Sequence, residues 1–256
     1  MQKGLTVETI DALMVLKNIP IQPDLSWLMT RLSFHIDITS HREELARLLE
    51  QAILLARPEA IYKSSRVTDR TDNCLKIDGI EFNNPLLRVN LKQVERVFPY
   101  VVTCGKKMDS TISLNNYFNL GEAKYVVREM ILTEATNYLQ SYITDSYGLD
   151  FLWSLQPGSM QAWPVTDRTL LFSILGKVEK SIGVRLSKNG SLSPQYSACG
   201  IFYNSPIELE GCQVCAQEPC MGRRAPYSEE LAKKYSHKAR RPCGSSSRNT
   251  VQRLNR

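Results

Sequence analysis

Residues 183–203, Gly183-Val-Arg-Leu-Ser-Lys-Asn-Gly-Ser-Leu-Ser-Pro-Gln-Tyr-Ser-Ala-Cys-Gly-Ile-Phe-Tyr203, decide the fold class of this chain. A strand is expected to start at Gly183, and Asn189-Gly190 is a dipeptide preferred in tight hairpin turns. The apolar run Cys199-Gly-Ile-Phe-Tyr203 is expected to return as the partner strand. The segment therefore predicts an antiparallel sheet.

Helical patterns precede this segment. The strongest covers residues 122–147, where apolar residues form one continuous stripe and Gly148 ends the pattern. Further helices are expected over residues 6–16, after a capping box at Ser40 and Glu43, and after Thr166. Strands are expected over residues 60–63, 75–78 and 100–104. Because helices and strands mix without a βαβ rhythm, the expected class is α+β with a mainly antiparallel sheet flanked by helices.

Composition limits the function. The chain has 256 residues, and 43% of them are apolar, which is enough for an ordinary buried core. It contains no run of eighteen apolar residues, and its first residues lack the apolar stretch of a signal peptide. We expect a cytoplasmic protein without a membrane span. A reducing compartment favours metal-bound or free thiols over disulfides, and Cys74 is expected to be a thiol at a strand edge.

The net charge of +6 does not indicate nucleic-acid binding. Residues 237–256 hold six Lys and Arg and no Asp or Glu, which leaves 26 basic and 26 acidic residues in the rest of the chain. This basic tail is expected to be disordered. The predicted organisation is an N-terminal helical segment (1–39), an α+β core (40–210), a cysteine-rich metal-binding segment (211–236) and the tail (237–256).

The cysteine-rich segment is the main candidate for chemistry. Cys212-x2-Cys215-x4-Cys220 places three of the seven cysteines within nine residues, which is typical of a metal site. Zinc and a four-iron cluster both require a fourth donor or an open position. The candidate fourth ligands are Cys199 and Cys104, each in a predicted strand, and Cys243 in the tail. Spacing alone does not separate the two metals.

Several elements in fixed order resemble the activation domain of cobalamin-dependent methionine synthase, above all its free-standing relatives. The resemblance spans about residues 40–227 and is strongest over 155–203. It rests on Leu155-Gln-Pro-Gly158, Trp163-Pro164, Leu171-Phe172, Ile182-Gly-Val-Arg-Leu-Ser187 and Ser193-Pro-Gln-Tyr-Ser-Ala-Cys-Gly-Ile201.

The resemblance implies a fold and a function. In that family a twisted antiparallel sheet with flanking helices restores a corrinoid whose cobalt has slipped to Co(II). One electron and a methyl group from S-adenosylmethionine complete the reaction. The positions that the resemblance implies around the cofactor cleft are Pro157, Gly158, Trp163, Cys199 and Gly200.

The chain departs from the family at the nucleotide site. The family's Arg-x-x-x-Gly-Tyr motif falls on Ser154, Gly158 and Ser159, so only the glycine is kept, and a family tyrosine falls on Phe202. The missing arginine is a charged donor worth roughly 1.5–3 kcal/mol against a buried carboxylate. We therefore do not expect S-adenosylmethionine to bind as it does in the methionine synthase domain.

The resemblance and the cysteine segment together predict an accessory protein that reduces Co(II) in a corrinoid. A cluster of the 4Fe-4S type is expected on Cys212, Cys215 and Cys220, and it is favoured over zinc because cobalt activation requires low-potential electrons. The expected partner is a corrinoid-binding protein or a cobalamin-dependent methyltransferase. Two alternatives stay open: reductive methylation with S-adenosylmethionine, and a zinc-stapled docking protein without redox activity.

Overall fold

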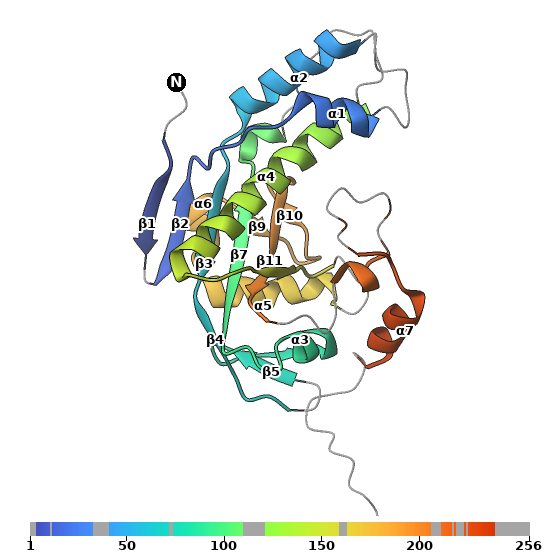
Figure 1. The fold of residues 1–256 in the computed structure, drawn as a ribbon. Coiled ribbons are helices and arrows are strands. Elements are labelled where there is room, and N and C mark those ends of the chain that lie inside the picture. Colours follow the sequence, from blue (N-terminus) through green and yellow to red (C-terminus); the bar gives the residue numbers. More distant parts are fainter. Residues whose placement is uncertain are drawn as a thin grey trace, which may run out of the picture.

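The computed structural model describes residues 4–10, 12–32, 41–71, 74–109, 121–158, 163–205, 211–216, 218, 223 and 225–238. Within these residues the chain forms a nine-stranded sheet with helices on both faces (Figure 1). The strand order is β1-β2-β3-β7-β4-β5-β6, and β11 pairs with both β7 and β8. The strands are β1 (Thr6–Ile10), β2 (Leu13–Lys17), β3 (Glu59–Lys63), β4 (Ser65–Thr68), β5 (Cys74–Ile77), β6 (Ile80–Asn83), β7 (Arg96–Thr103), β8 (Trp153–Leu155) and β11 (Ser197–Tyr203).

Strand β7 is the centre of the sheet. It pairs antiparallel with β3 and β4, and with β11 along seven residues. The ladder to β3 ends at the Tyr62–Tyr100 pair and resumes in β4 at the Ser65–Val97 pair. Pro99, which has no N–H to donate, lies opposite this break. The neighbouring strand thus changes from β3 to β4 where β7 lacks a donor.

The sheet separates two apolar cores. One core contains side chains of α1 (Leu25–Leu32), α2 (Arg42–Leu55) and α4 (Gly121–Tyr147), packed on β7 and β11. The other core contains side chains of α3 (Pro85–Asn90), α5 (Arg168–Leu175), α6 (Val178–Ile182) and α7 (Glu229–Lys238). Because side chains alternate along a strand, neighbouring residues of β7 and β11 belong to different cores.

The predicted α+β class, with an antiparallel sheet flanked by helices, is confirmed. The stripe predicted over residues 122–147 is α4, and its apolar residues are buried. Gly148 follows α4 with a φ of +60°, a backbone conformation that favours glycine. Helix α2 is also confirmed, although Ser40 of its expected capping box lies outside the described residues.

The helix predicted over residues 6–16 is wrong, because this segment is the β1–β2 hairpin. Ala12, with a φ of +65°, interrupts the segment, and Leu13 and Val15 alternate into the core. Strand β2 pairs with β3, so the first part of the chain extends the main sheet instead of forming a helical segment. The apolar spacing of residues 6–16 fits a helix because two short strands joined by a turn place apolar residues at similar intervals.

Two further predictions are corrected in the region of the quoted sequence. Thr166 does not cap a helix; it lies in the 3-10 helix η3 (Val165–Asp167), and α5 ends at Leu175, before Gly176. The Asn189-Gly190 turn does join two short strands, β9 (Arg185–Leu186) and β10 (Leu192–Ser193). Residues 199–203, however, pair with β7 and β8 instead of closing that hairpin.

Strand β1 forms one edge of the sheet. Charged side chains on β1 and on the two strands next to it lie side by side. Lys17 forms an ion pair with Glu8 at 2.8 Å and lies opposite Glu59 in the β2–β3 register. Burial raises the pKa of the Glu59 carboxyl, while the Lys17 ammonium group opposes that shift. The three side chains form a charged row over β1, β2 and β3.

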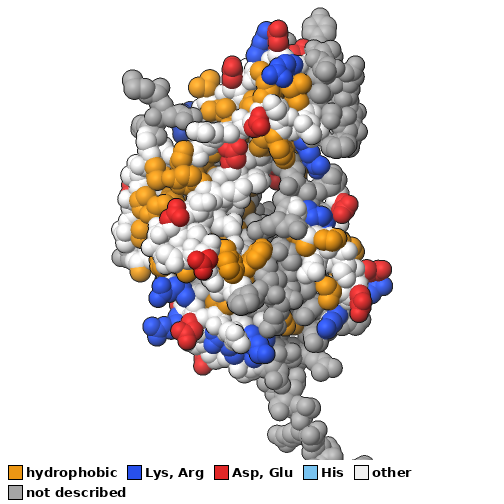
Figure 2. Space-filling model, in the orientation of Figure 1, with side chains coloured by type: hydrophobic (Ala, Val, Ile, Leu, Met, Phe, Trp, Pro, Cys, Tyr) orange, Lys and Arg blue, Asp and Glu red, His pale blue; other side chains and the backbone are white. Residues whose placement is uncertain are grey.

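Acidic and basic side chains are interspersed over the face drawn in Figure 2, in agreement with the equal numbers counted outside the tail. Among the helices that the structure describes, none is both long and apolar enough to cross a bilayer.

Replacing Gly200 by alanine is expected to lower the free energy of unfolding by roughly 1–3 kcal/mol. An added Cβ would lie 2.5 Å from the Leu155 carbonyl oxygen and 2.9 Å from the Tyr100 hydroxyl. Urea unfolding measures the change. Gly4→Ala is the matched control, because nothing lies within 4 Å of its Cβ position, and equal stability of the two variants would contradict the packing described.

Candidate functional site

The Pro157-Gly158 turn follows β8 and is held from three sides. Gly158 has a φ of +87°, and its N–H donates to the Trp163 carbonyl at 2.8 Å. Its Cβ position lies 3.2 Å from Val165, so the turn packs directly on η3. The Arg168 guanidinium donates to the Gly190 carbonyl at 2.8 Å and contacts the Pro157 carbonyl at 3.4 Å. The turn is therefore rigid and depends on an arginine that sequence reasoning did not select.

Trp163 is a buried anchor beside this turn. Its side chain is fully buried and belongs to the same core cluster as Leu171. Burial raises the pKa of the neighbouring Asp167 carboxyl, and the nearby Trp163 indole opposes that shift. The resemblance implies a position around the cofactor cleft for Trp163, whereas its complete burial favours a role as a core anchor.

Cys199 and Gly200 are neighbours in β11 that face opposite cores. Cys199 lies on the side of α5, and burial raises the pKa of its thiol to about 12, with the Arg168 charge acting against the shift. A thiol with this pKa is neutral at physiological pH. Gly200 pairs with Tyr100 and leaves room for the Tyr100 hydroxyl and the Leu155 carbonyl.

A polar network fills the position where the family has its arginine. The Tyr100 hydroxyl lies 3.0 Å from the Ser154 hydroxyl and accepts a hydrogen bond from the Gln156 amide at 2.9 Å. The Tyr100 ring stacks on Phe202, with centroids 4.0 Å apart and planes 12° apart. Neither Tyr100 nor Gln156 was predicted as a site residue. The only available signal was a tyrosine in a strand expected to be buried.

The cysteine segment begins with a short turn. Cys212 lies in the 3-10 helix η4 (Gly211–Val214), and the Cys215 N–H donates to the Cys212 carbonyl at 3.3 Å. Cys212 is half-buried, whereas Cys215 is 8% exposed and packs in the core that also contains Cys199. The third predicted ligand, Cys220, lies outside the described residues, as does Cys243.

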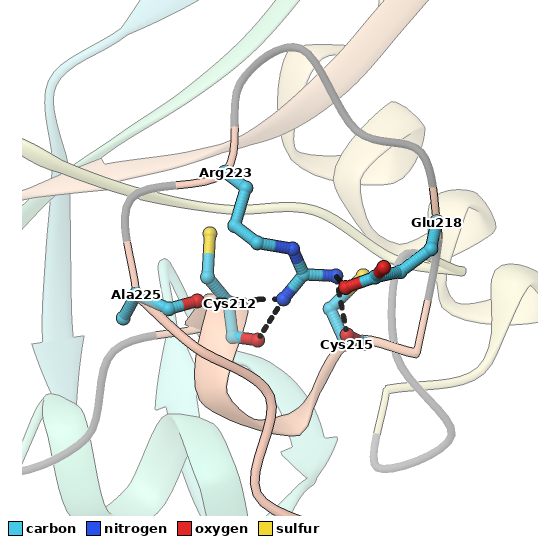
Figure 3. Close-up of polar contacts among 5 residues, drawn as sticks. All are labelled: Cys212, Cys215, Glu218, Arg223 and Ala225. Atoms are coloured by element: carbon cyan, nitrogen blue, oxygen red, sulfur yellow. Dashed lines mark hydrogen bonds and ion pairs between the residues drawn. The ribbon is translucent and has the colours of Figure 1, made fainter.

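Arg223 lies between the two cysteine carbonyls (Figure 3). Its guanidinium donates to the Cys212 carbonyl at 3.1 Å and to the Cys215 carbonyl at 3.2 Å. It also contacts the Ala225 carbonyl at 3.4 Å and pairs with Glu218 at 3.4 Å. The Arg223 side chain is only 19% exposed.

Cys104 lies apart from the cysteine segment. It is completely buried in the core of α2 and α4, on the other side of the sheet from Cys215. Burial raises the pKa of its thiol, and the nearby charges of Glu129 and Asp109 add to the shift. Within the described ranges, no three His, Cys, Asp or Glu residues are placed to hold a metal ion. Cys74 is disulfide-bonded, so the expectation of a free thiol there is wrong.

Comparisons with known proteins identify the fold and no family. No protein-family model matches the chain, and no curated protein matches its sequence. Among solved structures, the chain is similar to the MetH reactivation domain bound to AdoHcy, with a TM-score of 0.50 and 12% sequence identity. The match covers 69% of this chain and 70% of that chain. The fold implied by the methionine synthase resemblance is thereby confirmed.

Glu129→Gln is expected to raise the free energy of unfolding at pH 7 and to leave it nearly unchanged at pH 4. Burial raises the pKa of the half-buried Glu129 carboxyl in the folded protein. The stability that the protonated carboxyl contributes below the unfolded pKa, about 4.3, is lost as the pH rises through the folded pKa. Urea unfolding across this range measures the difference, with exposed Glu50→Gln as control. A difference that does not change with pH would contradict the role given to burial.

Proposed function

We propose that this protein reactivates a corrinoid protein by delivering an electron to its Co(II). Two observations support the proposal: the fold likeness to a methionine synthase reactivation domain, and a cysteine pair held in one turn by an arginine. The partner in this proposal is a corrinoid-binding domain or a cobalamin-dependent methyltransferase, and the corrinoid is its cargo. The fold likeness supports the general role in corrinoid reactivation. The cysteine pair supports the proposed electron transfer.

The cysteine segment fits a thiolate-bound group in part. Cys212 and Cys215 come from the two ends of one hydrogen-bonded turn, as in many metal-binding Cys-x2-Cys pairs. We propose Cys220 as the third ligand on the sequence spacing alone. An iron–sulfur cluster, when bound, supplies one-electron chemistry at low potential. The chain's own residues would hold it, and Arg223 would add positive charge beside the thiolates.

The fourth ligand is better sought at Cys199 than at Cys104. Cys199 belongs to the core that contains Cys215. Cys104 belongs to the core on the opposite face of the sheet, which separates it from Cys215. Cys199 is buried and neutral, so ligation would require its deprotonation by the metal. A cluster with three thiolates and one open iron remains the alternative arrangement.

Zinc is the main competing occupant. It uses the same thiolates, and the protein would then dock a corrinoid or methyltransferase subunit without transferring electrons. Cys74 is disulfide-bonded, so this chain also carries oxidised cysteine. An electron-transferring cluster of low potential does not require such a disulfide. The identity of the bound metal therefore decides between the two functions.

The chain's residues do not fit S-adenosylmethionine in the manner of the methionine synthase domain. Ser154 replaces the arginine, and its hydroxyl is already within hydrogen-bond distance of Tyr100. Phe202 replaces a tyrosine, and its ring is covered by Tyr100. Because the solved neighbour holds AdoHcy, binding through backbone groups around Pro157-Gly158 is kept as the second candidate.

Anaerobic reconstitution with iron and sulfide is expected to give visible absorption and, after reduction, an electron paramagnetic resonance signal. Cys212→Ser and Cys215→Ser should abolish both, because each removes a thiolate ligand. Cys104→Ser is the control, since it lies across the sheet, and it should take up iron like the wild type. Stoichiometric zinc with no iron uptake by the wild-type protein would sink the redox proposal.

Calorimetric titration with S-adenosylmethionine is expected to give no binding heat at millimolar ligand. The reason is that Ser154 and Phe202 lack the charge and the hydroxyl of the family's residues. Measurable binding that Gly158→Val removes would instead favour the methylation candidate.

A further inference from the structure

A groove lies beside the C-terminal half of α4. Residues of the helix line it together with Asp150, Phe151 and Leu152, which lead into β8. The Gln140 side-chain amide donates to the Leu152 carbonyl at 2.6 Å and ties the helix to this segment. The groove has a volume of about 400 Å³, within the range of roughly 300–1,000 Å³ that is usual for binding sites. It is therefore large enough to receive long side chains.

The lining of the groove carries negative charge alone. Its charged residues are Asp145 and Asp150, and the described residues that line it include no Lys, Arg or His. Within the part of the chain that the structure describes, neither carboxylate has an ion-pair partner. Arg96 contacts the end of α4 through the Tyr147 ring, 5.7 Å from the ring centroid, and does not line the groove. The two carboxylates are thus available to a positively charged ligand.

The end of α4 adds to the negative potential of the groove. A helix carries about half a negative elementary charge at its C-terminus, and Lys or Arg in the last turn stabilises such an end. The last turn of α4 contains Asp145 and no basic residue. Phe151 is 40% exposed beside it, and the face of an aromatic ring also attracts cations. These features together favour Lys and Arg side chains as the ligand.

The chain itself contains a matching segment, the basic tail of residues 237–256. The tail holds six Lys and Arg and no Asp or Glu, whereas the rest of the chain is balanced. Helix α7 ends at Lys238, and the residues after it span up to about 60 Å when extended. A chain of this length folds to a radius of gyration of roughly 18 Å, or a sphere about 46 Å across. The tail is therefore long enough to extend across the body of the molecule.

We propose that the basic tail of this chain binds in the groove beside α4, through ion pairs from its arginines to Asp145 and Asp150. Each exposed ion pair is weak by itself. Because the tail is part of the same chain, its effective concentration at the groove is high, and several weak pairs suffice. The inference is independent of the proposed corrinoid reactivation. It gives the excess positive charge of the chain a partner within the chain.

Trypsin cleavage of the tail tests this contact on the full-length protein. Trypsin cuts after Lys and Arg, so an arginine held in the groove is protected whenever the tail is bound. Mass spectrometry measures the rates of cleavage after Arg248 and Arg253 at low salt. The test variant is Asp145→Asn with Asp150→Asn, and circular dichroism verifies that it is folded.

A matched control removes two carboxylates elsewhere. Glu50→Gln with Glu81→Gln neutralises two exposed side chains that do not line the groove. This variant has the same net charge as the test variant, so a general effect of charge on trypsin would appear in both. Its tail is expected to be cut at the wild-type rate.

The test variant is expected to be cut roughly three- to tenfold faster than the wild type, the size of losing two exposed ion pairs. At about 1 M salt, where charges are screened beyond about 3 Å, the two proteins should be cut at equal rates. Equal rates at low salt would overturn the proposal. An equal increase in the control variant would overturn it as well, because the effect would not belong to the groove.

A second experiment separates the chain's own tail from other occupants of the groove. The arginines of the tail are replaced by glutamine in the full-length protein, and a fluorescent peptide of residues 239–256 with Cys243→Ser is added. Fluorescence anisotropy is expected to show salt-dependent binding, which Asp145→Asn with Asp150→Asn weakens. Absence of binding would mean that the groove serves another ligand and would overturn the proposal. Cleavage of the wild-type tail that slows with rising protein concentration would place the tail on a second copy and overturn the intramolecular contact.

Discussion

The close approach of three strands at Gly200 is the constraint on which the rest of the structure depends. Strand β11 lies between β7 and β8, and its glycine leaves space for the Tyr100 hydroxyl from one side and the Leu155 carbonyl from the other. The Pro157-Gly158 turn begins directly after β8. Its position is therefore set by how closely β8 can approach β11, and the polar network around Tyr100 follows from the same approach.

The sheet also determines which cysteines can act together. Because side chains alternate along β7 and β11, Cys104 falls among the helices α2 and α4 and Cys199 falls on the side of α5. The cysteine segment packs on the second side through Cys215. Any shared chemistry is thus confined to one face of the sheet. The other face, covered by α1, α2 and α4, holds Cys104 with the charge of Glu129 near it.

From the sequence, elements with a long periodic pattern can be predicted. Candidate site residues can be predicted where they form a motif along the chain. The apolar stripe of α4 has room for only one interpretation over twenty-seven residues. The apolar spacing of the short segment 6–16 predicts a helix, and it does not indicate the pairing of β2 with β3 that makes this segment a hairpin. Arg168 was not selected as a site residue because what makes it important is a carbonyl far away in the sequence. Arg168 reaches Gly190, twenty-two residues away, and no local pattern encodes such a contact.

The charged row on β1, β2 and β3 affects self-association through the edge of the sheet. A sheet that ends in an open strand offers unpaired backbone groups to any other strand, and self-association through such edges leads to aggregation. Strand β1 is only five residues long, and Glu8 is paired with Lys17 across it. A second copy adding its own β1 antiparallel to this edge would bring another Glu8 close to the first. Like charges there oppose pairing of β1 with its own copy, so this short, charged margin disfavours polymerisation through the sheet edge.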